Sequence, residues 1–416
     1  MNFPARLLCA VMLLAQPVRA PAAEALAVYP PVPGLAPSGH FTVRVRSPDS
    51  PGGWHNAFAW ETVCKSVPKG SDGYFDTLAG WSHTYVNFET AGAVEIEIAR
   101  TNGEPIRTAV VHPGRHSSAC HVETGKALVS LGKPCLVAVD IDGQMDGQDT
   151  GKGYRGPPLH TISIFANPPI EAKPRPDDPG VFVVKPGEPP PTEGPWTTLC
   201  FAPGVHDVGL AYRLRAGCQY YLPGDAIVYG TLSSPQWGTA NGVRLFGHGT
   251  LSGARLKHPG HVEPAIPEET HGRYRPIEVM GATDVRVEGL TIADSATHSL
   301  MLVHPYQPGH PNEVRWCKIL TWRVNGDGIN PFGNTLVEDC FIRTQDDSLY
   351  VNGRGIRRTV LWNDANGSSF VLSAVPQLTD RSLIVEDCDV IYSRAKWHRW
   401  TGGRVFNMRG EGAGAT

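Results

Sequence analysis

The chain divides into two regions that differ in their pattern of apolar and polar positions. Between residues 41 and 167, short segments such as FTVRVRS, AVEIEIA and LHTISIF alternate apolar and polar side chains, and turn residues separate them. Alternation with a period of two turns one face of each strand toward a core and the other toward solvent, which is typical of an antiparallel sandwich. We therefore predict a β-sandwich domain over residues 24–190.

A proline-rich stretch separates this region from the rest of the chain. It covers residues 167–195 and contains NPPIEAKPRPDDPG and KPGEPPPTEGP. Proline cannot donate to the hydrogen-bond ladder of a sheet, so this stretch cannot be a central strand. We place a domain boundary within it, between residues 190 and 191.

Beyond the boundary the pattern changes to a loose internal repeat. The motif Val-x-x-(Leu/Cys)-x-(Ile/Val) occurs at 287–292, 314–319, 337–342 and 385–390, with a weaker copy, RRTVLW, at 357–362. Strand-like copies at a spacing of roughly 24 residues, with no helical pattern between them, indicate a solenoid of stacked β-coils. We predict an all-β chain in which a parallel β-helix occupies residues 191–416. Because the last residues, RVFNMRGEGAGAT, show no amphipathic cap, we expect the β-helix to be truncated at its carboxyl end.

Cysteines recur at equivalent positions of this repeat. Cys317, Cys340 and Cys388 occupy the Leu/Cys position, and we expect them to form an inward-facing ladder of free thiols, since free cysteine behaves as a small buried hydrophobe. Cys200 and Cys218 are a candidate disulfide pair. The sequence contains no CxxC pair, which argues against a zinc site.

The amino-terminal residues predict export. MNFPARLLCAVMLLAQPVRAPAAEA has a positive start, a short apolar stretch and small residues at a cleavage-site spacing, so residues 1–23 are predicted to be a signal peptide. We expect a secreted or periplasmic protein that acts as a monomer. The formal net charge of −3 argues against nucleic acid or an anionic membrane as the main partner.

Three aspartates are the candidate chemistry of the β-helix. Asp327 lies in a glycine turn, and Asp346 and Asp347 are adjacent. Each group follows a strand of the repeat, so the carboxylates should lie on neighbouring coils, within about 10 Å of one another. Clustered like charges raise at least one pKa, and a glycosidase needs one protonated carboxylic acid beside a carboxylate. Because neighbouring strand residues point to opposite faces, the adjacent pair is predicted to lie at a bend.

Over residues 322–364 the chain resembles glycoside hydrolase family 49, the dextranases and isopullulanases. DGIN, the spacing from Asp327 to Asp346, and DDSLY match the two aspartate blocks of that family, and LWNDANG follows at 361–367. The resemblance implies a β-sandwich followed by a right-handed parallel β-helix. It further implies an inverting hydrolase of an α-glucan such as dextran or pullulan, without metal or organic cofactor. Asp346 would be the general acid, and Asp327 and Asp347 would hold and activate the attacking water.

Three alternatives remain. Polygalacturonases of family 28 share the lone aspartate and the aspartate pair, and Arg343, Arg354, Arg357 and Arg358 could bind an acidic polysaccharide. They also carry a Gly-His-Gly after the pair, whereas the GHG of this chain, around His248, precedes it and is interpreted as a turn. A β-helix polysaccharide lyase would use Ca²⁺ on clustered aspartates. A carbohydrate-binding protein without catalysis is the third alternative.

Further residues are candidates for binding the polysaccharide. Aromatic rings can stack on the C–H faces of sugars, and amide and carboxylate groups can bind their hydroxyls. The candidates are Trp322, Asn330, Tyr350, Trp362, Asp364 and Trp397.

Overall fold

The computed structural model describes most of the chain between residues 26 and 409. The described residues are 26–49, 53–63, 81–147, 158–234, 236–257, 272–303, 307, 309–323, 325–364, 367–373, 384–393 and 405–409. They form four β-sheets, which confirms the all-β prediction. The predicted signal peptide and Trp397 lie outside the described residues.

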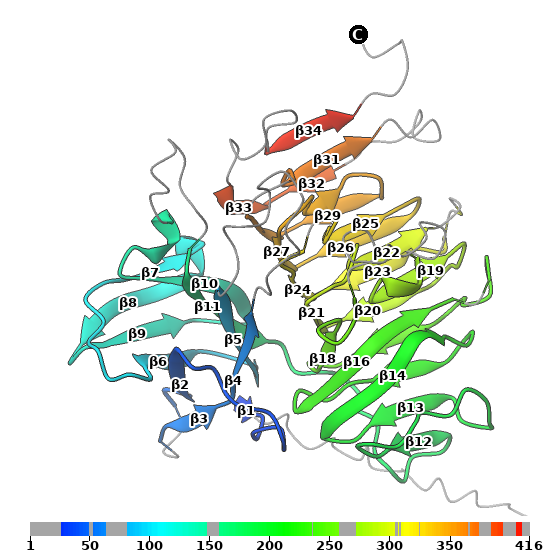
Figure 1. Cartoon of the computed structure of the whole chain (residues 1–416), viewed down its shortest axis with the longest axis horizontal. Coiled ribbons are helices and arrows are strands. Elements are labelled where there is room, and N and C mark those ends of the chain that lie inside the picture. Colours follow the sequence, from blue (N-terminus) through cyan, green and yellow to red (C-terminus); the bar gives the residue numbers. More distant parts are fainter. Residues whose placement is uncertain are drawn as a thin grey trace, which may run out of the picture.

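Two facing sheets make the amino-terminal sandwich (Figure 1). One contains β1 (Leu26–Val28), β4 (Ala59–Val63), β5 (Ser82–Thr90), β7 (Ala109–His112), β10 (Cys135–Ile141) and β11 (His160–Asn167). The other contains β2 (Phe41–Arg46), β3 (His55–Ala57), β6 (Val94–Arg100), β8 (Ser117–Glu123) and β9 (Lys126–Leu131). The predicted alternation is present in β2 and β6, where every second side chain is buried in the shared core. The pairing is antiparallel except between β5 and β11, which run parallel.

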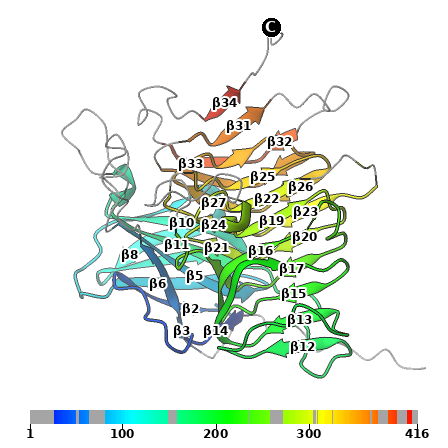
Figure 2. The ribbon, with the colours of Figure 1, turned by 45° about the vertical axis from the view of Figure 1, so that its right-hand side comes forward.

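The β-helix begins with β12 (Val181–Val184), which pairs in parallel with β13 (Thr198–Phe201). Its nine-stranded sheet continues with β15 (Gln219–Tyr221), β17 (Arg244–Phe246), β20 (Arg286–Glu288), β23 (Asn312–Arg315), β26 (Thr335–Glu338), β29 (Gly355–Arg357) and β32 (Ile384–Glu386). Figure 2 shows these strands stacked one above another. Because β12 precedes residue 190, the parallel sheet starts within the proline-rich stretch. The exact boundary at residue 190 stays a prediction.

The remaining strands form a fourteen-stranded parallel sheet that folds around the other sides of the coils. One row holds β14 (Gly204–Arg213), β16 (Ala226–Ser233), β18 (Thr250–Ser252), β21 (Thr291–Ala293), β24 (Lys318–Leu320), β27 (Phe341–Thr344), β30 (Val360–Asn363) and β33 (Asp389–Ser393). The other row holds β19 (Ile277–Met280), β22 (Leu300–Val303), β25 (Ile329–Pro331), β28 (Leu349–Tyr350), β31 (Phe370–Ser373) and β34 (Phe406–Arg409).

The repeat motif forms the apolar interior of the coils. Ile319, Ile342, Leu361 and Val390 pair in register on β24, β27, β30 and β33. Two residues earlier, the same register aligns Cys317, Cys340, Thr359 and Cys388, so the predicted thiol ladder is present with a threonine between its last two members. Cys317 and Cys340 are almost fully buried.

The predicted disulfide between Cys200 and Cys218 is wrong, because both are free thiols. Cys218 belongs to the core of the β-helix, whereas Cys200 packs with Tyr221 and Phe246 in a separate cluster. Cys200 lies between the core residues Leu199 and Phe201 on β13, so strand alternation turns its side chain to the opposite face.

The sandwich covers one side of the β-helix. Every residue of β5 is buried. Val86 and Phe88 enter the sandwich core, while Tyr85 belongs to a cluster shared with the β-helix and its hydroxyl lies 3.0 Å from Thr250 Oγ1 on β18. In the part of the chain that the structure describes, no helix is long and apolar enough to cross a membrane.

Candidate functional site

Strand register places two of the three aspartates at one position of successive coils. Leu300 pairs with Ile329, Ile329 with Leu349, and Leu349 with Phe370. Two residues before each of these lie, in order, His298, Asp327, Asp347 and Ser368. The four tetrapeptides HSLM, DGIN, DSLY and SSFV are therefore structurally equivalent. Parallel strands are about 4.8 Å apart, so the equivalent side chains form a column along the β-helix.

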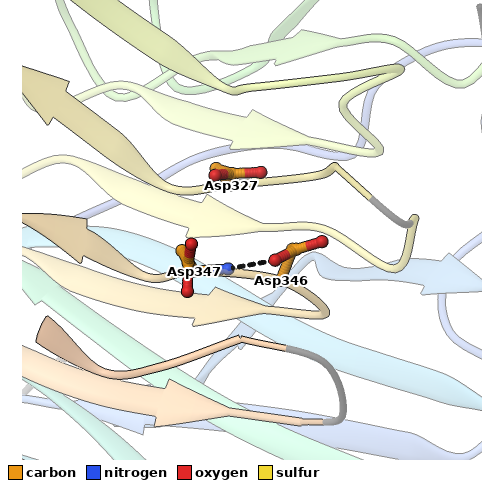
Figure 3. A group of neighbouring side chains, drawn as sticks. All are labelled: Asp327, Asp346 and Asp347. Carbon is orange, nitrogen blue, oxygen red and sulfur yellow. Dashed lines mark hydrogen bonds between the residues drawn. The ribbon is translucent and has the colours of Figure 1, made fainter. Parts of the chain in front are cut away.

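The three carboxylates form a compact cluster (Figure 3). One oxygen of each lies within 4.8 Å of the corresponding oxygens of the other two. The exposed fractions are 4% for Asp327, 8% for Asp346 and 1% for Asp347. The sequence prediction of three neighbouring carboxylates thus agrees with their placement.

Backbone amides hold the carboxylates of the adjacent pair. Asp346 accepts hydrogen bonds from its neighbour's amide, Asp347 N, at 2.9 Å and from Asn325 N at 3.0 Å. Asp347 accepts one from Ser368 N at 2.8 Å. Hydrogen bonds to a charged carboxylate offset part of the cost of burying it.

The tyrosine that follows the pair also bonds the cluster. The Tyr350 hydroxyl lies 2.6 Å from Asp327 Oδ2 and 3.3 Å from Asp347 Oδ2. Tyr350 and Asn330 project on the same outer face, since each follows an inward-facing residue of its strand, Leu349 or Ile329. The Asn330 amide oxygen in turn accepts a hydrogen bond from Asn352 at 3.4 Å. Of the predicted binding residues, Tyr350 and Asn330 therefore lie at the aspartates.

A bend between β27 and β28 lets both adjacent aspartates reach the same site. The carbonyl oxygen of Asp346 accepts hydrogen bonds from Thr344 Oγ1 at 2.6 Å and from Asn363 Nδ2 at 2.8 Å. On the next coil Gly367 packs directly against this backbone, and a Cβ there would lie 2.1 Å from Asp347 N. The bend expected from strand alternation is thus present, and buried polar side chains fix it from inside the coil.

His298 was not singled out from the sequence. Its Nε2 lies 3.7 Å from Asp327 Oδ1, and its ring stacks on Tyr350 with centroids 6.3 Å apart. The signal was available, because aligning HSLM with DGIN puts His298 opposite Asp327. It was missed because the first tetrapeptide contains no carboxylate.

Trp322, Trp362 and Asp364 lie elsewhere, in the interface between the β-helix and the sandwich. Their exposed fractions are 4%, 0% and 0%. The guanidinium of Arg343 lies between the two indole rings, 4.2 Å from the Trp322 centroid and 4.3 Å from that of Trp362. Asp364 accepts hydrogen bonds from Arg343 Nε at 2.8 Å and from Trp362 Nε1 at 2.9 Å. The tryptophans thus stack on an arginine, and in these positions neither ring has a face open to a sugar.

His248 lies in a turn, as expected, but it is buried where the β-helix meets the sandwich. Its two ring nitrogens lie 3.2 Å from Gly289 O and 3.0 Å from Pro168 O. Burial, together with the nearby Lys318 ammonium, lowers the pKa of His248 to about 3. The residue therefore contributes to the interior rather than to the aspartate site.

The same three aspartates could offer one oxygen each to a hard cation such as Ca²⁺. As a chemical unit, the cluster can also hold a water, donate a proton from whichever carboxyl is protonated, and accept one on another. A chelator such as EDTA would abolish a use that depends on a bound cation, but not acid–base chemistry by the carboxyl groups alone. The charge of the substrate that is cleaved distinguishes the two uses further.

No protein-family model matches this chain. Its sequence is 23% identical, over 86% of its length, to a dextranase from Arthrobacter globiformis, and the match covers 64% of that protein. It is 22% identical, over 85% of its length, to an isopullulanase from Aspergillus niger, covering 65% of that protein. The chain thus spans less than two thirds of the length of these curated relatives. The predicted resemblance to dextranases and isopullulanases is confirmed.

Among solved structures, Dex49A from Penicillium minioluteum superposes with a TM-score of 0.67. The superposition covers 92% of this chain and 77% of that protein, at 18% sequence identity. The two proteins therefore share a fold, which confirms a β-sandwich followed by a parallel β-helix.

Proposed function

We propose that this protein is a secreted glycoside hydrolase that cleaves an α-glucan such as dextran or pullulan with inversion at the anomeric carbon. The observation that carries the proposal is the cluster of Asp327, Asp346 and Asp347 at equivalent and adjacent positions of two neighbouring coils. Sequence similarity to a dextranase and an isopullulanase supports the choice of substrate.

Each carboxylate has a proposed role. Asp346 donates the proton to the departing glycosidic oxygen; among the three it has the largest exposed fraction, 8%. Asp327 and Asp347 hold and deprotonate the attacking water. A water can bridge two oxygens that lie within 4.8 Å, because each of its hydrogen bonds spans about 2.8 Å. Tyr350 and His298 orient Asp327 for this task.

Retention is the competing stereochemical course. The observation in its favour is that one oxygen of each carboxylate lies within 4.8 Å of those of the other two. Inverting pairs are typically about 6.5–9.5 Å apart, whereas retaining pairs are about 5–5.5 Å apart. A water held by two carboxylates, with a third as the acid, needs no covalent intermediate, and for this reason we propose inversion. Proton NMR of the first product formed distinguishes the two anomers directly.

An acidic polysaccharide fits the charges less well. Arg343 is buried in its ion pair with Asp364. Arg357 and Arg358 pair with acidic residues on the nine-stranded sheet and its corner, away from the aspartates. These three arginines are therefore not positioned to bind uronate groups at the cluster.

The test measures reducing-end release from dextran, pullulan and polygalacturonate, with and without EDTA. Asp346→Asn should lower release from a neutral α-glucan by about 10²- to 10⁴-fold, the usual contribution of general acid catalysis. Asp284→Asn, an exposed aspartate on another coil, is the control and should retain activity. Release only from polygalacturonate would replace the proposal with a polygalacturonase, and loss of activity with EDTA would favour a lyase.

Export and oligomeric state also belong to this proposal. We propose export through the amino-terminal segment, which amino-terminal sequencing of protein from the culture medium would test by finding the chain cut near residue 23. We also propose that the protein is a monomer, which light scattering would test.

A further inference from the structure

A cavity lies between the sandwich and the β-helix. Its volume is about 540 Å³, within the usual range for ligand pockets. The sandwich contributes Arg115 and His116, from the 3₁₀ turn η1 (Gly114–His116), and Lys133. The β-helix contributes Trp316, Asp339, Arg358 and Asp387.

Four residues of the β-helix wall of this cavity form a column at one corner of the coils. Arg315, Glu338, Arg357 and Glu386 pair in register on successive coils. The next residue in each case is a cavity residue, Trp316, Asp339, Arg358 or Asp387, and their φ values are 56°, 55°, 47° and 55°. Their side chains therefore leave consecutive coils at the same corner, about 4.8 Å apart.

Trp316 is the unusual member of this column. A positive φ is uncommon for residues other than glycine, and for a bulky side chain it is an outlier that points to function. The preceding coil has Gly289 at this corner, with a φ of 78°. Since glycine satisfies the same backbone conformation one coil earlier, the turn itself does not require an indole.

The charges around the indole are balanced. Arg358 donates two hydrogen bonds to the Asp339 carboxylate, at 2.8 and 2.9 Å, and Arg115 donates one to Asp389 at 2.6 Å. Burial and the neighbouring Arg115 lower the pKa of His116, which keeps it neutral near pH 7. Paired charges create little net field for an ionic ligand, but they offer donors and acceptors to hydroxyl groups. An indole adds a flat apolar face.

We propose that this cavity is a second, non-catalytic binding site for a neutral saccharide, with Trp316 as its stacking platform. The identity of the saccharide, a short α-glucan, rests on the proposed function. The cavity is separate from the aspartates because strand β27 lies between Asp339 and Asp346. At about 3.3 Å per extended residue, the stretch from Asp339 to Asp346 can span up to roughly 20 Å. The site would hold one part of a polysaccharide molecule while another part of that molecule is cleaved at the aspartates.

The experiment titrates isomaltotetraose calorimetrically into the full-length Asp346→Asn protein, which keeps the ligand intact. Two binding events are expected. Adding Trp316→Gly should abolish one of them, and this variant should fold because glycine already occupies the corner of the preceding coil. Trp237→Ala, at an indole that is 60% exposed and does not line the cavity, is the matched control. Lys133→Ala, at an exposed side chain, should weaken the same event several-fold.

The single variant Trp316→Gly should hydrolyse isomaltotetraose at the wild-type rate. The affinity of this variant for long dextran should fall at least threefold. A single binding event that neither Trp316→Gly nor Lys133→Ala changes would overturn the inference, even if hydrolysis stands. Two events in a protein that cleaves no α-glucan would refute the proposed function and leave this site standing. Absence of any binding would overturn the second site.

Discussion

The Tyr350 hydroxyl lies between two carboxylates but has one proton to donate. Its distance of 2.6 Å to Asp327, against 3.3 Å to Asp347, indicates that Asp327 receives the hydrogen bond. A buried carboxylate that loses a donor pays the cost of its desolvation, so this hydroxyl orients Asp327 and stabilises its charge. The backbone amides that bond Asp346 and Asp347 cannot be removed by substitution, which makes Tyr350 the accessible test of the cluster.

We expect Tyr350→Phe to lower kcat by about 10- to 100-fold, because about 1.4–2.8 kcal/mol is the usual strength of a hydrogen bond to a charged group. KM should change little, since the ring remains. Steady-state kinetics on the α-glucan substrate measures both. Tyr229→Phe, which alters a hydroxyl on β16, is the control. A kcat equal to that of the wild type would mean that the hydroxyl does not act on Asp327.

At the scale of the element, the site depends on how closely successive coils approach. Gly328, next to Asp327, packs against the coil that carries the pair, and a Cβ at Gly328 would lie 2.1 Å from Ser348 O. Gly367, on the following coil, packs against the backbone of the pair itself, and a Cβ there would lie 2.1 Å from Asp347 N. The absence of a side chain at both glycines lets the backbones of neighbouring coils approach closely, so the column of equivalent positions can keep its strand spacing.

Gly328→Ala is therefore expected to destabilise the protein by about 1–3 kcal/mol, the usual cost of overpacking, and to reduce activity by displacing Asp327 from Asp347. Gly355→Ala is the matched control within the β-helix, because its nearest neighbour would be the Leu336 side chain at 3.3 Å. Urea unfolding and activity of both variants provide the comparison. Equal stability of the two would show that the coils can separate without cost.

At the scale of the whole molecule, the interface between sandwich and β-helix contains charges that are removed from water. Arg343 and Asp364 are 1% and 0% exposed and lie 2.8 Å apart. Arg343 also contacts His83 and Thr161 of the sandwich. An ion pair at the same distance, Arg358–Asp339, is 45% and 22% exposed. The two pairs differ in burial rather than in length.

Removing one partner from each pair should consequently have unequal effects. Arg343→Leu leaves Asp364 as a buried, uncompensated charge and is expected to cost about 3–5 kcal/mol of unfolding free energy. Arg358→Leu is expected to cost at most about 1 kcal/mol. Denaturant unfolding measures both, and the double variant Arg343→Leu/Asp364→Leu should recover part of the loss. A cost for Arg343→Leu no larger than that for Arg358→Leu would contradict the role of burial.

Lys318 makes the stability of this interface depend on pH. Its ammonium is fully buried, near Asn167 of the sandwich, and burial lowers its pKa to about 7. The unfolded chain has an ordinary lysine pKa of about 10.4, so between pH 7 and 10.4 it binds a proton that the folded protein does not. For this group, unfolding free energy therefore rises with pH across that window and levels off below pH 7.

Lys318→Met should flatten the rise by up to about 1.4 kcal/mol per pH unit, the value for one proton. Urea unfolding at pH 7, 8 and 9 would measure the slope in wild type and variant. Lys126→Met, at a lysine on the sandwich surface, is the control and should leave the slope of unfolding free energy against pH unchanged. Identical slopes for wild type and Lys318→Met would mean that Lys318 stays protonated in the folded protein.

The sequence by itself determined the fold class and the candidate chemistry. A period of two in one region and a repeat of roughly 24 residues in the other specify which side chains enter each core, because alternation and coil stacking are local consequences of strand geometry. The positions of Asp327 and of the Asp346–Asp347 pair, each after a strand of successive copies of the repeat, likewise predicted that their carboxylates meet. These inferences needed only the order of residues along the chain.

Only the tertiary structure decided which side of the β-helix is covered. Trp322 and Trp362 have the aromatic rings that suit sugar binding. The sandwich nevertheless packs over their side of the coils, and both rings stack on Arg343. Register between coils, not composition, brought His298 to Asp327. Such placements depend on contacts between residues far apart in the chain, whose packing free energy no local pattern encodes.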